Sequence, residues 1–173
     1  MPEPEGGWFG PRGVAVASDG TIAVTDTGNK RVVLYEPGRA TDFSIQLLGG
    51  SGDAPGRFSE PVGLAWLDSD RLVVADTGNH RLQILDRSGV VLKLIEIEEA
   101  WRDFYSRPQV AVLDGERILV SDTPSGSLWL IEGDDVKRLE LGEDGIAPTG
   151  LAWRDGVLYI GDSNGRVWLF DTP

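Results

Sequence analysis

The sequence contains no cysteine and only one histidine, His80, among its 173 residues. Without cysteine, a disulfide or a thiolate nucleophile is excluded, and one histidine excludes a metal site built from several histidines of the same chain. No apolar run approaches the roughly 20 residues of a membrane-spanning helix. The acidic start, rich in proline and glycine, does not resemble a signal peptide. We therefore expect no membrane segment and a cytoplasmic location.

Basic residues are also scarce. The chain has 16 lysines and arginines against 28 aspartates and glutamates, which gives a formal net charge of −12. Binding to a phosphate backbone requires a basic surface, so nucleic acid is disfavoured as a partner, although a small basic patch remains compatible with this charge. Hydrophobic residues make up 40% of the chain, which is enough for a packed core.

What the sequence does contain is an internal repeat. An aspartate closes the same apolar run in four segments, at Asp26, Asp76, Asp122 and Asp162, spaced 50, 46 and 40 residues apart. Each segment alternates apolar runs of five or six residues with turn signals, which is typical of antiparallel strands. A period of this length fits a propeller blade of four short strands.

The repeat predicts an all-β fold, a β-propeller with about four blades in this chain. We expect one propeller or partial propeller domain over residues 1–173, with blades at approximately 11–48, 61–95, 108–141 and 148–171. The first strand of each blade is rich in small residues, which suits the crowded axis where blades converge. The fourth blade lacks an outer strand, because the sequence stops after its third.

Two of these segments resemble a known repeat. The NHL family takes its name from three positions, which here correspond to Asn79, His80 and Leu82, on either side of Arg81. Residues 26–32 match the same repeat almost as well. The third and fourth segments are degraded versions. The resemblance implies a β-propeller, usually of six blades, that serves mostly in protein or RNA binding. Some related six-bladed propellers are metal-dependent hydrolases or lyases.

With four blades, the last of them incomplete, the sequence does not decide how the propeller ring closes. The chain could be a fragment of a longer propeller, could share a ring with a second copy, or could form a small ring with an open seam. An unpaired strand edge invites another strand. This favours a homo-oligomer or a longer parent chain over an open monomer.

The recurring polar residues are interpreted as structural. Each aspartate ends a strand, where its carboxylate can accept hydrogen bonds from backbone N–H groups of the following turn, and glycine in that turn can supply a positive φ. An arginine begins the next strand and can pair with a carboxylate nearby. A group that recurs in all blades serves the blade itself. The predicted structural residues are Asp26, Asp76, Asp122, Asp162, Arg31, Arg81 and Arg166.

Binding residues are expected where the repeat is broken. Residues 98–107 carry three aromatic side chains and two arginines, a composition that suits a recognition loop but equally suits aromatics packed on blade edges. Arg12 and Lys30 are further cations expected on the loop face. The candidate partner contacts are Arg57, Phe58, His80, Trp101, Arg102, Tyr105 and Arg107.

These residues favour a non-catalytic scaffold that binds a protein partner or a second copy of itself. His80 has no identifiable nucleophile or acid partner, and we predict no catalytic residue, metal or cofactor. One alternative is a calcium-dependent hydrolase or lyase, which would collect Glu, Asn and Asp ligands around the axis. The axial strands offer mostly Gly, Ala, Val and Trp instead. The other alternative is an RNA-binding module.

Overall fold

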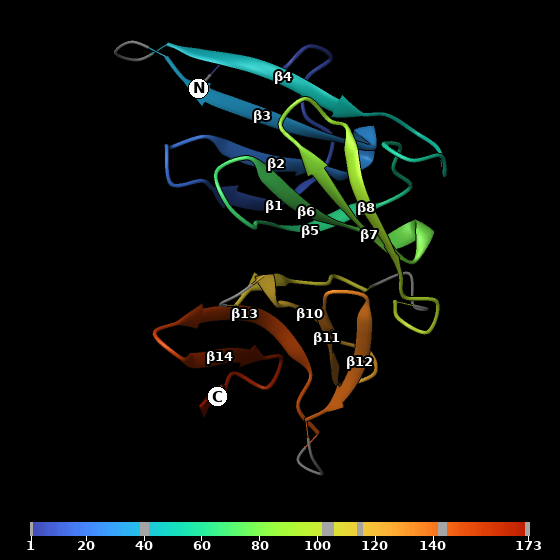
Figure 1. The fold of residues 1–173 in the computed structure, drawn as a ribbon, viewed down its shortest axis with the longest axis vertical. Helices are drawn as coiled ribbons and strands as arrows, with labels where there is room; N and C mark the ends of the chain where they lie inside the picture. The colour runs from blue at the N-terminus through green and yellow to red at the C-terminus, as the bar shows by residue number, and fades with distance from the viewer. Residues whose placement is uncertain (1, 39–41, 102–105, 114–115, 142–144, 172–173) are drawn as a thin grey trace. The chain divides into compact units, whose positions relative to one another are not determined.

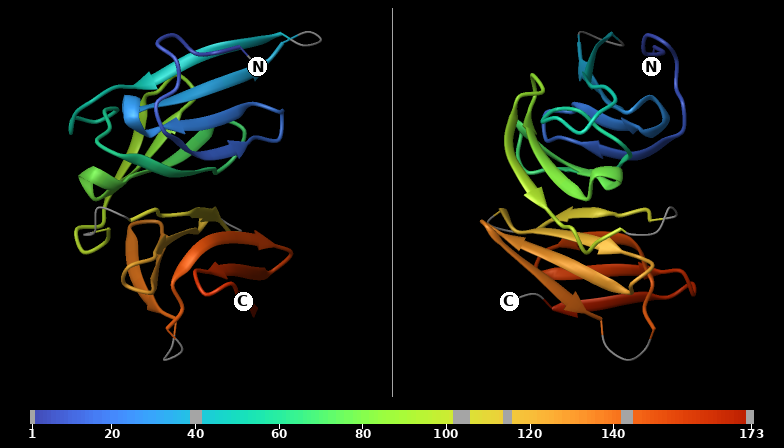
Figure 2. Two further views of the ribbon diagram at one scale, coloured as in Figure 1. Left: turned by 180° about the vertical axis from the view of Figure 1, so that it is seen from behind. Right: turned by 90° about the vertical axis from the view of Figure 1, so that its right-hand side faces the viewer.

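The computed structural model describes residues 2–38, 42–101, 106–113, 116–141 and 145–171. Its strands form four antiparallel sheets in sequence order, each a propeller blade (Figures 1 and 2). The chain divides into two compact units, Met1–Glu96 and Ile97–Pro173, with two blades in each. The all-β propeller class expected from the repeat is confirmed.

Unit 1 holds blades 1 and 2, in which four strands pair in the order of the chain. A single 3₁₀ turn joins the second and third strand of each blade. Blade 1 comprises β1 (Pro11–Val16), β2 (Ile22–Asp26), η1 (Thr27–Asn29), β3 (Arg31–Pro37) and β4 (Phe43–Gly49). Blade 2 comprises β5 (Pro61–Trp66), β6 (Arg71–Asp76), η2 (Thr77–Asn79), β7 (Arg81–Asp86) and β8 (Val91–Glu96).

Unit 2 holds blades 3 and 4. Blade 3 comprises β9 (Val110–Val112), β10 (Ile118–Asp122), β11 (Ser127–Glu132) and β12 (Asp135–Glu140). Blade 4 comprises β13 (Pro148–Arg154), β14 (Val157–Asp162) and β15 (Val167–Asp171). Within the described residues, blade 4 therefore has three strands, and the outer edge of β15 has no neighbouring strand.

The two blades of unit 1 meet most closely at their first strands. A Cβ added to Gly13 of β1 would lie 2.4 Å from the carbonyl oxygen of Val62 in β5, so only glycine permits this approach. The Thr25 hydroxyl donates to the same Val62 oxygen at 2.7 Å, and the Thr27 hydroxyl donates to the Pro61 oxygen at 2.6 Å. The small residues of the first strand thus allow β1 and β5 to pack closely.

An apolar layer fills the space between the blades of each unit. In unit 1, Ala23, Val32 and Leu34 of blade 1 pack in one cluster with Leu72 and Val74 of blade 2. In unit 2, the same kind of layer joins blade 3 to blade 4. Its buried members are Leu113, Leu119, Leu128, Ile146, Leu158 and Ile160.

The turn after β2 and β6 differs from the expectation in one respect. The left-handed residues are Lys30 (φ 56°) and His80 (φ 52°), not the glycines before them. Gly28 is required for a different reason, because an added Cβ would lie 2.3 Å from the ring of Phe9. The glycine therefore makes room for the preceding segment, and the following residue carries the positive φ.

Candidate functional site

Asp26 anchors the segment that precedes blade 1. Its carboxylate is fully buried and accepts three hydrogen bonds. The Phe9 backbone N–H donates to Oδ1 at 2.8 Å, and the Asn29 amide and Arg31 Nε donate to Oδ2 at 2.7 and 2.8 Å. The Arg31 guanidinium also donates to the carbonyl oxygens of Glu5 and Gly7. One ion pair thus fastens residues 5–9 to the blade.

Asp76 repeats this arrangement in blade 2. The Ser59 N–H, the Asn79 amide, Arg81 Nε and the Gln83 amide all donate to its buried carboxylate, at 2.7 to 3.0 Å. The guanidinium of Arg81 in turn donates to the backbone carbonyls of Asp53, Ala54 and Arg57. Asp76 and Arg81 are the counterparts of Asp26 and Arg31, 50 residues later in the sequence. They hold the segment that joins blade 1 to blade 2.

Blade 4 keeps the pair with a shorter turn. Arg166 lies 2.9 Å from Oδ2 of Asp162, and the Trp168 indole Nε1 donates to the same oxygen at 3.0 Å. The hydrogen bond from Trp168 is the main cause that holds the pKa of Asp162 below its usual value of 3.8, with further help from the Asn164 N–H and Arg166. Here the following turn does supply a backbone donor, as expected from the sequence.

Blade 3 has lost its arginine. Ser127 stands at that position, and a chain of hydrogen bonds replaces the direct pair. Arg138 Nε donates to the Ser127 hydroxyl at 2.9 Å, the hydroxyls of Ser127 and Ser125 lie 2.8 Å apart, and Ser125 donates to Oδ2 of Asp122 at 2.6 Å. Asp122 is therefore linked to Arg138 of β12 only through two serine hydroxyls, and Arg138 pairs directly with Glu140 at 3.0 Å.

These four carboxylates each belong to their own blade, and those of Asp26 and Asp76 also bind the preceding chain segment. Asp26 and Asp76 are 0% exposed and have their oxygens occupied by donors of the protein. Such an arrangement stabilises loops and offers no open face to a substrate. In blades 1 and 2 the backbone donor comes from the preceding segment, not from the following turn, which corrects the expected partner.

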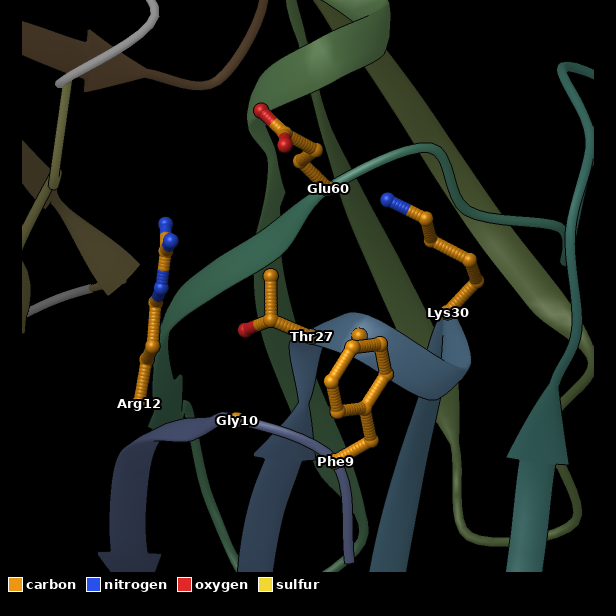
Figure 3. Close-up of a pocket in the computed structure, with 7 residues that line it drawn as sticks. Phe9, Gly10, Arg12, Thr27, Lys30 and Glu60 are labelled. Atoms are coloured by element: carbon orange, nitrogen blue, oxygen red, sulfur yellow. The ribbon is translucent and has the colours of Figure 1, made fainter.

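A pocket opens beside the first of these anchors, on the loop face of unit 1. We define this face as the end that carries residues 7–10, 27–30, 50–60 and 77–80. The pocket has a volume of about 390 Å³. Figure 3 shows side chains from three segments around it, with Thr27 between them. Its lining residues are Phe9, Gly10, Arg12, Thr27, Gly28, Lys30 and Glu60.

The pocket combines two cations, one carboxylate and an aromatic ring. Arg12 extends from β1, Lys30 follows η1, and Glu60 precedes β5 (Figure 3). The ring of Phe9 is 67% exposed, although its backbone is fixed by the bond to Asp26 and by the Gly28 N–H, which donates to the Phe9 oxygen at 2.7 Å. The cations expected on the loop face thus include two that line one pocket, on opposite sides of Thr27 (Figure 3).

The predicted partner contacts fall into different environments. Phe58 is fully buried in the unit 1 core, directly beneath Gly49, and Trp101 is 3% exposed with its indole donating to the Ser121 oxygen. Neither side chain offers a surface to a partner. Arg57 and His80 lie on the loop face of unit 1, and Arg107 is exposed in unit 2. Arg102 and Tyr105 lie outside the described residues.

Phe9 and Glu60 were not among the residues that the sequence singled out. A usable signal did exist for Phe9, because the residue 50 positions later is Ser59. An aromatic side chain at a position that holds serine in the next repeat breaks the pattern. No comparable signal marks Glu60, whose role depends on the contact of blade 2 with the turn of blade 1.

Two kinds of feature are absent from the residues that the structure describes. These residues contain no group of three or more His, Cys, Asp and Glu side chains placed to hold a metal ion. They also contain no helix with the length and apolar character to cross a membrane.

The chain is similar to several known proteins. A family model described as NHL repeat matches residues 10–35 and 58–85. The chain is 28% identical over 189 residues to the E3 ubiquitin-protein ligase NHLRC1 of Mus musculus, in an alignment that covers 96% of this chain and 45% of the relative. It therefore spans less than half of that relative's length.

Solved structures share the architecture. Virginiamycin B lyase from Staphylococcus aureus superposes with a TM-score of 0.71 at 13% identity, over 91% of this chain and 50% of the lyase. The computationally designed Ika4 protein superposes with a TM-score of 0.67 at 13% identity, and each chain is covered completely. At such identities the likeness shows the fold alone. This chain therefore has a β-propeller fold, and residues 10–35 and 58–85 match the NHL repeat.

Proposed function

We propose that this chain is a protein-interaction module whose loop-face pocket in unit 1 binds a partner segment that carries a carboxylate beside an apolar side chain. The observation that carries the proposal is the combination of Arg12 and Lys30 with the exposed ring of Phe9 in one pocket. A pocket of about 390 Å³ is within the usual range for ligand sites,.

The pocket places two cationic side chains on a molecule whose net charge is negative. The chain as a whole carries a formal charge of −12, but at physiological ionic strength charges are screened beyond about 8 Å. A carboxylate that enters the pocket therefore interacts mainly with Arg12 and Lys30. Glu60 at the rim disfavours a second carboxylate next to the first, which selects a segment with one acidic group at that point.

Phe9 supplies the apolar part of the contact. Aromatic side chains contribute a large contact area, and they dominate contact energies when they are held in place. The backbone of Phe9 is fixed on both sides, through its N–H to Asp26 and through its carbonyl to the Gly28 N–H. Because this order exists before binding, little conformational entropy is lost on association.

Two other residues extend the proposed surface. His80 follows η2 as Lys30 follows η1, and Arg57 lies on the segment that precedes blade 2. Similarity to a ubiquitin-protein ligase supports the choice of a protein as partner, since that class of enzyme acts on proteins. The likeness to the Staphylococcus lyase supports the fold only.

Fluorescence anisotropy with labelled short peptides tests this proposal. One probe places a glutamate beside a leucine, and a matched probe replaces the glutamate by lysine. We expect the acidic probe to bind more tightly. Arg12→Glu and Lys30→Glu should each weaken it by up to about five-fold, since an exposed ion pair contributes up to about 1 kcal/mol. Arg154→Glu, an exposed change in unit 2, is the matched control.

Several results would overturn the proposal. Equal binding of the acidic and basic probes would remove the assigned role of the two cations. Equal losses from Arg12→Glu and Arg154→Glu would show only an effect of net charge. Tight binding of a single-stranded RNA, with no binding of either peptide, would favour the RNA-binding alternative.

A further inference from the structure

The interface between blades 1 and 2 has two distinct sides. We call the side of a blade that packs on the following blade its leading face, and the side that packs on the preceding blade its trailing face. The leading face of blade 1 consists of Ala15, Ala23, Val32, Leu34 and Leu48. The trailing face of blade 2 includes Leu64, Trp66, Leu72, Val74 and Leu85.

The trailing face of blade 1 corresponds to the trailing face of blade 2, with each residue 50 positions earlier in the sequence. Val14 pairs with Val24, and Val16 pairs with Ile22, as Leu64 pairs with Val74 and Trp66 with Leu72 in blade 2. Leu64 is buried, whereas Val14 is 67% and Val16 64% exposed. A surface that is covered in blade 2 is therefore open along β1.

The leading face of blade 4 is exposed in the same way. Tyr159 pairs with Ala152 and with Leu169, as Ala23 pairs with Ala15 and with Leu34 in blade 1. Ala23, Val32 and Leu34 are fully buried. Their counterparts Tyr159, Val167 and Leu169 are exposed, the last two by 65% and 62%.

The opposite side of blade 4 is already occupied. Leu158 and Ile160 pack in the unit 2 core, together with Leu151, Trp153 and Trp168. Alternation along β14 sends successive side chains to opposite sides of a sheet, so Tyr159 lies on the other side from this core. Among the described residues, blade 4 thus exposes its leading face, and blade 1 exposes the part of its trailing face along β1. The outer part of that trailing face is covered, because Tyr35 is buried against Trp8 and donates to the Pro2 carbonyl oxygen.

We propose that the leading face of blade 4 packs on the trailing face of blade 1 of a second copy of this chain. Each face is apolar, and each has a buried counterpart in the blade 1–blade 2 interface, so the contact continues an interface that the fold already uses. Large apolar patches on a surface commonly mark an interaction site. The inference is independent of the loop pocket, because neither face includes its lining residues.

The contact is head-to-tail, so two copies would close through two equivalent contacts. Each copy carries a formal charge of −12, so electrostatic repulsion opposes their association. Added salt shortens the distance over which this repulsion acts. The association should therefore strengthen as salt is added. Binding of an acidic peptide through Arg12 and Lys30 should weaken under the same change, which separates this proposal from the pocket.

Light scattering on the full chain tests the contact. We expect a mass of twice the 18.7 kDa chain mass, and a return to 18.7 kDa in Val16→Arg and in Leu169→Arg. Leu92→Arg, at an exposed leucine outside both faces, should keep the doubled mass. Thermal unfolding of each variant confirms that it is folded, since all three sites are exposed.

A mixture of the two monomeric variants provides the sharper measurement. The Val16→Arg chain keeps an intact leading face, and the Leu169→Arg chain keeps an intact trailing face. Together they can form one unaltered contact, so the mixture should regain mass that neither variant shows alone. A mass of 18.7 kDa for the unaltered chain at all concentrations would overturn the proposal, as would a doubled mass in Leu169→Arg or no gain in the mixture.

Discussion

The indole Nε1 of Trp168 donates a hydrogen bond to Oδ2 of Asp162 at 3.0 Å. Gln83 makes the same contact with Asp76 in blade 2, from the equivalent place on the third strand. An amide and an indole are different in shape and size, yet each brings one N–H to the carboxylate. Blades 2 and 4 thus bring an N–H to the carboxylate with different side chains, whereas the indole of Trp129, at the same place in blade 3, has no hydrogen-bond partner among the described residues.

This contact predicts a pH dependence. The pKa of Asp162 is lowered below 3.8 in the folded chain, mainly by Trp168. A carboxyl with a lowered folded pKa contributes stability that is present above its unfolded pKa and is lost as the pH falls through the folded value. Trp168→Phe removes the main cause. Urea unfolding near neutral pH and below pH 3.8 should therefore show a smaller acid-induced loss for Trp168→Phe than for the unaltered chain.

Trp129→Phe is the matched control for that measurement. Trp129 occupies the equivalent strand position in blade 3, and among the described residues its indole Nε1 has no hydrogen-bond partner. Its replacement should leave the acid-induced loss unchanged. Equal effects of the two substitutions would show that the bond to Asp162 does not govern the pH dependence.

The Thr25 hydroxyl makes one contact between blades, and we expect its removal to lower the free energy of unfolding. It donates to the Val62 oxygen and accepts the Gly13 N–H, both inside unit 1. Thr25→Val preserves the shape but leaves two backbone groups without a partner, which should lower the free energy of unfolding by about 1–3 kcal/mol. Thr149→Val removes a hydroxyl at an exposed site and should change it little. An unchanged midpoint in urea for Thr25→Val would disprove the role assigned to the hydroxyl.

Gly28 links the fold to the proposed pocket. A methyl group at this position would lie 2.3 Å from the Phe9 ring and 2.4 Å from its carbonyl oxygen, so Phe9 must move. Overpacking of this kind costs about 1–3 kcal/mol. Gly28→Ala should therefore destabilise the chain and weaken the acidic peptide probe together.

Gly150→Ala serves as the control, because an added methyl group there meets no atom within 4 Å. Both variants are measured by urea unfolding and by peptide anisotropy. If Gly28→Ala kept the affinity of the unaltered chain, Phe9 would not be part of the binding site.

The all-β propeller class was predictable because strands and turns depend on local signals. Alternating apolar runs and turn residues give strands, and the step of 50 residues between Asp26 and Asp76 gives the repeat. The structural interpretation of the aspartates followed from their recurrence. Their carboxylates accept hydrogen bonds within the blade, and Arg31, Arg81 and Arg166 pair with Asp26, Asp76 and Asp162.

The hydrogen-bond donors to the aspartates and the residues of the pocket could not be predicted from the sequence. Phe9 and Asp26 are 17 residues apart, and Ser127 and Arg138 are 11 apart. No local pattern marks such pairs, because they arise only when the sheet and the preceding segment are folded. Burial of Phe58 and Trp101 was hidden for the same reason, since an aromatic residue in a loop has the same composition whether it faces the core or the solvent.

The buried carboxylates of Asp26 and Asp76 have a central structural role, because each fastens the preceding chain segment to its blade. Asp76→Asn tests it most directly, because this change keeps the shape of the side chain while removing the charge that pairs with buried Arg81. Urea unfolding should show a loss of about 3–5 kcal/mol, as for a buried pair that loses one partner. Asp68→Asn, in the exposed pair with Arg71, should lose less than about 1 kcal/mol,. An Asp76→Asn chain as stable as the unaltered protein would contradict this role.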